Sequence, residues 1–146
     1  MGKHFLAVVL ISLASVTFST VKAQDKSPQQ IENSIRKKGK YAFLVQTSRH
    51  FIAAIETGER FKAKSTKIKF EVVLAGPVVK ELATGTELKP YVEKAEKAGI
   101  KIVVCENSMA HLGVKKSELA PSVMTTRYGF TYFLGLQENR FKTIQL

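Results

Sequence analysis

Three short apolar segments, each followed by residues that end a strand, constrain most strongly how this chain can fold. They have the length of buried strands and lie at residues 41–47 (YAFLVQT), 67–74 (KIKFEVVL) and 100–104 (IKIVV). Stretches with helical spacing of apolar residues follow or separate them, at residues 48–61, 78–83 and 88–98. Strands that alternate with helices predict an α/β fold, a three-layer α/β/α sandwich around a mainly parallel sheet of about five strands.

The boundaries of the other elements follow from local signals. Ile31 and Ile35 are four residues apart, so we expect a short helix at residues 28–38 that Gly39 ends. Ser48 is expected to cap the helix that follows the first strand, and Gly99 the end of the helix at residues 88–98. The later elements are expected to be a loop or one turn of helix at 106–112, a short turn at 115–119, a strand at 122–126, a helix at 128–139 and a strand at 141–145.

The helix expected at residues 128–139 has one side rich in large residues. Phe130, Phe133, Leu134 and Gln137 are spaced along it.

The N-terminus has the composition of a signal peptide. Lys3 and His4 precede an uncharged apolar run at residues 5–16, and Val21-Lys22-Ala23 matches a cleavage site. A retained membrane anchor is the alternative, but the run is shorter than the ~20 residues that a spanning helix needs. The sequence predicts a signal peptide at 1–23, a polar lead at 24–40 and one α/β domain at 41–146. The mature protein is expected to be periplasmic or secreted, without a stable membrane anchor.

Positive charge dominates the composition. The chain has 23 basic and 12 acidic residues, a net charge of +11. Such a balance is typical of proteins with anionic partners, and also of proteins that use charge for solubility. The lysines are scattered along the sequence and no aromatic and basic motif accompanies them, so no specific binding of nucleic acid is predicted.

Cys105 is the single cysteine of the chain, at the carboxyl end of the strand expected at residues 100–104. It cannot form an intramolecular disulfide. It is therefore an intermolecular or reactive thiol, or a buried structural residue. Functional groups of open α/β sheets gather at the carboxyl ends of strands, where residues 47–48 and 75–77 are also expected. These three segments could meet at one rim.

The residues beside Cys105 are the candidates for a site around its sulfur. Backbone N–H groups of Asn107, Ser108 and Met109 would stabilise a thiolate if they open a helical turn, and Gly76 would allow close approach of the backbone. His111, six residues after the cysteine, could exchange a proton with the sulfur. In the alternative interpretation, Asn107 and Ser108 form a turn, Met109 packs in the core, and His111 and His50 are surface residues.

Other chemistries lack their motifs. The chain has no GxGxxG, no GxxxxGK[ST], no CxxC and no GxSxG. Its histidines, His4, His50 and His111, do not make a convincing set of zinc ligands. No metal and no cofactor is predicted.

Four motifs in order resemble the DsrE/DsrF-like family, whose fold is often called YchN-like. They are EVVLAGPVVKEL (71–82), GIKIVVCENSM (99–109), ELAPSV (118–123) and a helix that ends in Gly135-Leu136-Gln137. The resemblance implies a three-layer α/β fold that assembles into homo-oligomers, trimers or hexamers. It also implies sulfur carried as a persulfide on the cysteine that matches Cys105, taken from a donor protein and passed to an acceptor protein.

The resemblance assigns Cys105 as the catalytic residue and Asn107 and Ser108 as residues that shape the site. The chain departs from the family in two respects. It has an export signal, so its acceptor is expected to differ from the cytoplasmic one. It also has Asn139-Arg140-Phe141 where the family often has a glycine-aromatic step before the last strand.

Three functions remain open on the sequence. The first is a sulfur carrier or sulfurtransferase-like protein that uses Cys105 as a persulfide, which predicts an accessible thiol with a lowered pKa. The second is a non-catalytic binding or assembly module of the same fold, with an inert, buried Cys105. The third is a protein that binds anions or surfaces through its basic charge, with binding that weakens steeply with salt.

Overall fold

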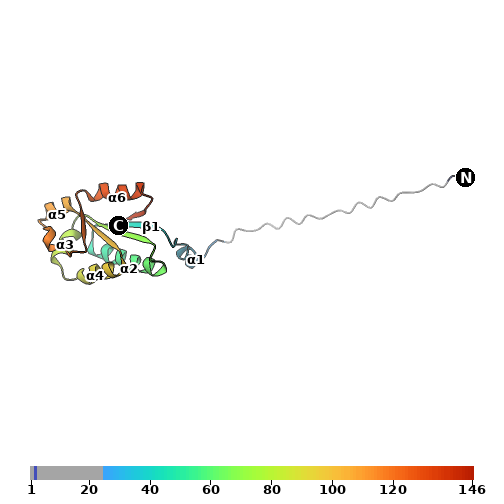
Figure 1. Cartoon of the computed structure of the whole chain (residues 1–146), viewed down its shortest axis with the longest axis horizontal. Helices are drawn as coiled ribbons and strands as arrows, with labels where there is room; N and C mark the ends of the chain where they lie inside the picture. Colours follow the sequence, from blue (N-terminus) through green and yellow to red (C-terminus); the bar gives the residue numbers. More distant parts are fainter. Residues whose placement is uncertain (1, 3–24) are drawn as a thin grey trace.

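The computed structural model describes Gly2 and residues 25–146, so the predicted signal peptide and its cleavage site lie outside the described residues apart from Gly2. Parallel strands form a five-stranded sheet in the order β4-β3-β2-β1-β5 (Figure 1). The strands are β1 (Lys40–Val45), β2 (Lys69–Leu74), β3 (Lys101–Cys105), β4 (Met124–Thr126) and β5 (Lys142–Gln145). The α/β architecture and the parallel sheet predicted from the sequence are confirmed.

Helices cover both faces of the sheet. They are α1 (Pro28–Glu32), α2 (Ser48–Lys64), α3 (Val78–Thr84), α4 (Lys89–Ala98), α5 (Glu106–Leu112) and α6 (Gly129–Glu138), with a 3₁₀ turn, η1 (Lys116–Glu118). Figure 1 shows α6 on one face of the sheet, with α2 and α4 on the other. Within the described part of the chain, no helix is long and apolar enough to cross a membrane.

Side chains alternate between two hydrophobic clusters along each central strand, as expected for a sheet buried on both faces. Phe43 of β1 and Val72 of β2 belong to the larger cluster, which α2 and α4 cover. Leu44 and Val73, their neighbours in the sequence, belong to the smaller cluster beneath α6. Cys105 at the end of β3 also belongs to this smaller cluster. The sheet therefore directs the sulfur toward α6.

Glycines shape two of the helices on the larger cluster. Gly58 weakens the helical pattern of α2, yet a Cβ at this position would lie 2.7 Å from Cδ1 of Ile100 and 2.9 Å from Cδ1 of Phe70. The glycine thus lets α2 approach the sheet closely. Gly99, at φ 68°, ends α4 in the left-handed conformation that the sequence predicts.

Three local predictions need correction near the ends of elements. The helix predicted at residues 28–38 ends at Glu32, because α1 buries no residue and therefore has no packed face to extend it. Ser48 is the first residue of α2, and Thr47 is its cap, with its hydroxyl oxygen 3.3 Å from the backbone nitrogen of His50. Residues 106–112, predicted as a loop or one turn of helix, form a helix of seven residues, α5, which is longer than a single turn.

The side of α6 that carries Phe130, Phe133, Leu134 and Gln137 does not face the sheet as a whole. Phe133 is buried, but Phe130 and Leu134 are 55% and 58% exposed. The buried side is made by Gly129, Phe133 and Leu136.

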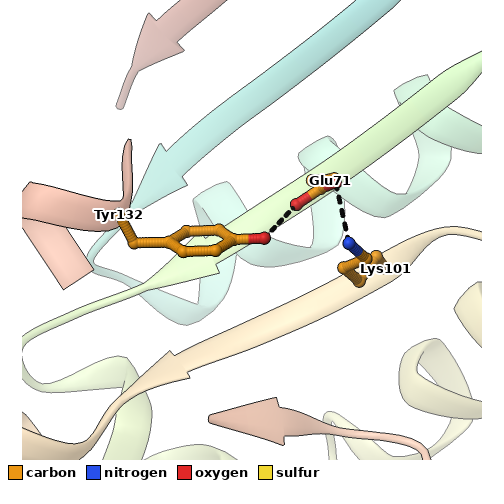
Figure 2. A network of polar contacts seen from close by, with 3 residues as sticks. All are labelled: Glu71, Lys101 and Tyr132. Atoms are coloured by element: carbon orange, nitrogen blue, oxygen red, sulfur yellow. Dashed lines mark hydrogen bonds and ion pairs between the residues drawn. The ribbon is translucent and has the colours of Figure 1, made fainter. Parts of the chain in front are cut away.

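Glu71 is a buried carboxylate within β2, and it fastens α6 to the sheet. Tyr132 of α6 donates its hydroxyl hydrogen to Oε2 of Glu71 at 2.7 Å, and Nζ of Lys101 lies 3.0 Å from Oε1 (Figure 2). A buried charge needs such partners, because its desolvation is costly. Burial, and then the hydrogen bond and charge of Glu71, raise the pKa of Tyr132 well above its usual range. The phenol therefore stays protonated as a donor.

We expect Tyr132→Phe to lower the free energy of unfolding by about 1–2 kcal/mol, because the buried Glu71 loses a hydrogen-bond donor. The raised pKa of Tyr132 contributes stability that is present below the phenol's unfolded pKa of about 10 and is lost above it. The difference between parent and variant should therefore shrink above that pH. Urea unfolding at several pH values measures both effects. The exposed Tyr128→Phe is the control, and an equal effect in both variants would refute the role of the network.

Candidate functional site

The three segments predicted at the carboxyl rim of the sheet do meet there. The backbone N–H of Val78 donates to the carbonyl oxygen of Gln46 at 3.1 Å, which joins the ends of β1 and β2. The N–H of Gly76 donates to Oγ of Ser108 at 3.0 Å, which joins the end of β2 to α5. The hydroxyl of Ser48 also donates to the carboxylate of Glu81. Hydrogen bonds therefore join the carboxyl ends of β1 and β2 to each other and to α5.

Cys105 lies where β3 becomes α5. It is the last residue of the strand and the N-cap of the helix, so its side chain sits beside the free N–H groups of the first turn. The residue is 4% exposed and packs in the smaller cluster with Ala75 and Phe133. The sequence prediction of its position at the strand end is confirmed. The accessible thiol that a carrier predicts is not found, because the side chain is buried, as the non-catalytic module predicts.

The amino end of α6 supplies the nearest hydrogen-bond donor to the sulfur. The backbone N–H of Gly129, the first residue of α6, donates to Sγ of Cys105 at 3.2 Å. The carbonyl oxygen of Arg127 lies 4.0 Å from Sγ and can accept the S–H hydrogen when the thiol is protonated. The same carbonyl accepts the N–H of Asn107 at 3.3 Å, so the segment before α6 is held against α5.

Hydrogen bonds determine the ionisation of Cys105. Burial has the largest single influence and by itself raises the pKa of the thiol. Hydrogen bonds from the backbone N–H groups of Gly129, Ser108 and Asn107, and from the hydroxyl of Ser108, together outweigh burial and leave the pKa below its ordinary value. The N–H dipoles at the start of two helices favour the thiolate, which is the nucleophilic form of cysteine.

Gly129 was not singled out in the sequence, although its backbone N–H is the nearest donor to the sulfur. A Cβ at this position would lie 2.9 Å from Cβ and 3.4 Å from Sγ of Cys105. A glycine is required here because the backbone of α6 approaches the cysteine side chain directly. Its sequence signal is weak, since glycines are common where a loop passes into a helix, whether or not a functional group lies nearby.

Asn107, Ser108 and Gly76, three of the predicted binding residues, lie around Cys105. The backbone N–H groups of Asn107 and Ser108 lower the pKa of its thiol, although the N–H of Asn107 donates to the carbonyl oxygen of Arg127. Gly76 acts through Ser108, whose hydroxyl it orients, and its φ of +73° is one that residues with a side chain rarely adopt. Met109 is buried in the larger cluster.

His111 and His50 are not among the groups that donate hydrogen bonds to the sulfur of Cys105. His111 is exposed on the last turn of α5, and no hydrogen bond joins it to the sulfur within the described residues. Its predicted role stays a prediction. His50 lies in the first turn of α2, and its Nδ1 is buried without a hydrogen-bond partner among the described residues.

The hydrogen-bond donors around Cys105 suit a nucleophilic thiolate. Across residues 25–146, no three His, Cys, Asp or Glu side chains are grouped so that they could hold a metal ion. A sulfur with several N–H donors around it is able to attack an electrophilic sulfur atom and to hold the product anion.

Comparison with known proteins agrees with this fold. The model of the DsrE/DsrF-like family matches residues 39–146. A solved structure of a protein of unknown function, MTH1491 from Methanobacterium thermoautotrophicum, has a TM-score of 0.67 and 17% identity, over 74% of this chain and 99% of that chain. A conserved protein of unknown function, BT1422 from Bacteroides thetaiotaomicron, has a TM-score of 0.59 and 20% identity, over 78% and 100%. No curated protein matches the chain.

Proposed function

The chain belongs to the DsrE/DsrF-like family, and on that premise we propose that it is a sulfur carrier that holds one sulfur atom as a persulfide on Cys105. Membership of the family indicates a function related to sulfur relay. One observation carries the finer proposal: the sulfur of Cys105 lies at the amino ends of two helices, α5 and α6, whose N–H groups lower its pKa. A structural cysteine in an apolar core would have a raised pKa instead.

Loading of the carrier transfers one sulfur atom from the cysteine of the donor protein to the thiolate of Cys105. The thiolate of Cys105 attacks the outer sulfur of a donor persulfide. A new S–S bond forms to Cys105 as the donor's S–S bond breaks, and the donor cysteine leaves as a thiolate. The proton of the donor persulfide stays with the transferred sulfur or goes to water, and no external oxidant or reductant is consumed. Delivery to an acceptor thiolate reverses these steps.

The residues around Cys105 have distinct roles in this proposal. The N–H groups of Gly129, Asn107 and Ser108 stabilise the thiolate before loading and after discharge. Gly76 fixes the Ser108 hydroxyl toward the sulfur. His111, at the exposed end of α5, is proposed to act at the rim, where the partner protein arrives, and to exchange protons there.

We further propose that the carrier works after export, in the periplasm or outside the cell. The composition of residues 1–23 supports a cleaved signal peptide. The donor and acceptor proteins would then be exported proteins too. A single cysteine fits such a carrier, since it cannot close an intramolecular disulfide in an oxidising compartment.

We also propose that the protein forms a homo-oligomer through the outer side of α6. Phe130 and Leu134, one helical turn apart, are both more than half exposed. Tyr128, just before the helix, is 52% exposed. Large apolar side chains that cluster on one exposed helix side are typical of protein interfaces. A second copy of the chain is the partner that the family resemblance favours.

Mass spectrometry of the intact protein tests loading. After incubation with polysulfide and removal of excess reagent, the parent should gain ~32 Da, the mass of one sulfur, and lose it on reduction. Cys105→Ser should gain nothing. A parent that takes up no sulfur, and whose Cys105 resists a small alkylating agent while folded, would instead be the non-catalytic binding or assembly module.

A further inference from the structure

A basic pocket lies at the amino-terminal ends of the strands, whereas Cys105 lies at the carboxyl-terminal end of β3. Its volume is about 730 Å³, within the range of sites for small molecules. Five lysines line it, whereas Glu71 is its one carboxylate, so the lining has a net charge of four positive. The lysines are Lys40, Lys62, Lys67, Lys69 and Lys101. Residues that are scattered in the sequence are thus gathered at one place by the fold.

The sheet explains why three of these lysines converge. Lys40, Lys69 and Lys101 are the first residues of three adjacent strands, β1, β2 and β3. Each precedes a residue of the larger cluster, so each belongs to the face that α6 covers. The helix α6 lies over only part of that face, and the pocket opens between its second half and the strand ends.

The positive charge of the pocket is largely uncompensated. Lys40 and Lys69 are direct partners in the register of β1 and β2, and like charges in that position destabilise a sheet. Lys40 and Lys62 donate to neutral carbonyl oxygens, of Asn139 at 3.1 Å and of Ile68 at 2.8 Å. Lys101 alone pairs with the carboxylate of Glu71. Within residues 25–146, Lys67 and Lys69 make no side-chain hydrogen bond or ion pair with a protein group.

Local features that cost stability without a structural gain are characteristic of binding sites. Here the feature is a group of ammonium ions around a concave surface. Leu136 and Phe141 add an apolar wall to the same pocket. A ligand that satisfies both features has several negative charges and an apolar part.

We propose that this pocket binds a small organic anion with two or more negative charges, such as a polycarboxylate or a phosphorylated compound. Lys67 and Lys69 supply the free ammonium groups that contact its charges, and Phe141 contacts its carbon skeleton. The pocket is separated from Cys105 by the length of β3, about 13 Å. The proposal is therefore independent of the sulfur chemistry.

Calorimetric titration with trimesate, a benzene tricarboxylate, tests the proposal on the full mature chain. We expect saturable binding of one trimesate per chain, at least tenfold weaker binding of benzoate, which has one charge, and a loss of affinity at high salt. The double variant Lys67→Gln/Lys69→Gln should weaken trimesate binding by about tenfold. The matched variant Lys80→Gln/Lys116→Gln removes two exposed lysines outside the pocket and should change affinity less than about twofold.

Thermal unfolding gives a second readout that does not depend on heats of binding. Trimesate should raise the midpoint of the parent and of the matched control, and should raise that of the pocket variant by clearly less at the same concentration. Equal losses of affinity in the two double variants would overturn the proposal, because binding would then follow net charge alone. Tight binding of a hexaglutamate peptide, with none of trimesate, would also overturn it, in favour of an acidic protein segment.

Discussion

Replacement of Gly129 by alanine should raise the pKa of Cys105 and destabilise the protein by about 1–3 kcal/mol. The added Cβ would lie 2.9 Å from Cβ of Cys105, closer than two such carbons approach in folded proteins. Cβ of Cys105 is fixed by the backbone of β3, so α6 must move away. The N–H of Gly129 then leaves the sulfur, while burial of the thiol continues to raise its pKa.

Gly135→Ala is the matched control for this prediction. Gly135 lies in the same helix, and a Cβ there would meet nothing within 4 Å. This variant should gain helix propensity, by about 0.5–1 kcal/mol, and leave the thiol unchanged. The rate of alkylation as a function of pH reports the pKa, and urea unfolding reports stability. An unchanged pH profile in Gly129→Ala would show that the start of α6 does not stabilise the thiolate.

If the proposed homo-oligomer forms, replacement of both Phe130 and Leu134 by aspartate should convert it into monomers. Each side chain is largely exposed in the single chain, and burial of such a side chain stabilises an interface by about 1.5–3 kcal/mol. Loss of both, with two charges added, should raise the dissociation constant by at least about 100-fold. Fold stability should change little, because neither residue contributes to the core.

Analytical ultracentrifugation over a range of concentrations measures this effect. Ser117→Asp, on the exposed η1 turn, introduces a charge away from α6 and should leave the oligomer intact. If the parent sediments as a monomer at every concentration, the proposed homo-oligomer does not form. An oligomer that survives in the double aspartate variant would place the interface elsewhere.

The strands could be predicted from the sequence because burial on both faces leaves an unambiguous pattern. After a first lysine, β1 and β3 consist of apolar residues, and β2 ends in three apolar residues, as expected for strands buried on both faces. The position of Cys105 followed from the same pattern, since it directly follows one of these runs. The predicted helix ends were less accurate where a cap or a short helix decided them, as at Thr47 and α5.

The parts of the site that depend on tertiary contacts could not be predicted in this way. Gly129 acts through its proximity to a cysteine 24 residues earlier, and no local pattern encodes that distance. Glu71 looks like an interruption of an apolar strand until Tyr132 and Lys101 are seen beside it. On α6, Phe130 and Phe133 look equivalent in the sequence, and only the placement of the helix on the sheet distinguishes them.

Two hydrogen bonds that join α6 to the sheet link the stability of the fold to the ionisation of Cys105. Tyr132 bonds to Glu71 in the middle of the helix, and Gly129 bonds to the sulfur at its start. The first contact therefore helps to hold the second in place. Variants that weaken the contacts of Glu71 are therefore expected to raise the pKa of Cys105 as well as to lower the free energy of unfolding. The change in the pKa should be smaller than in Gly129→Ala.

The central claim, that Cys105 carries a transferable sulfur atom, is tested most directly by cyanolysis. Cyanide removes the outer sulfur of a persulfide as thiocyanate and leaves the cysteine thiolate. Protein that has been treated with polysulfide and freed of excess reagent should release about one thiocyanate per chain. Cys105→Ser, treated in parallel, should release none. Equal release from both proteins, or none from the parent, would contradict the account and leave Cys105 as a residue of the core.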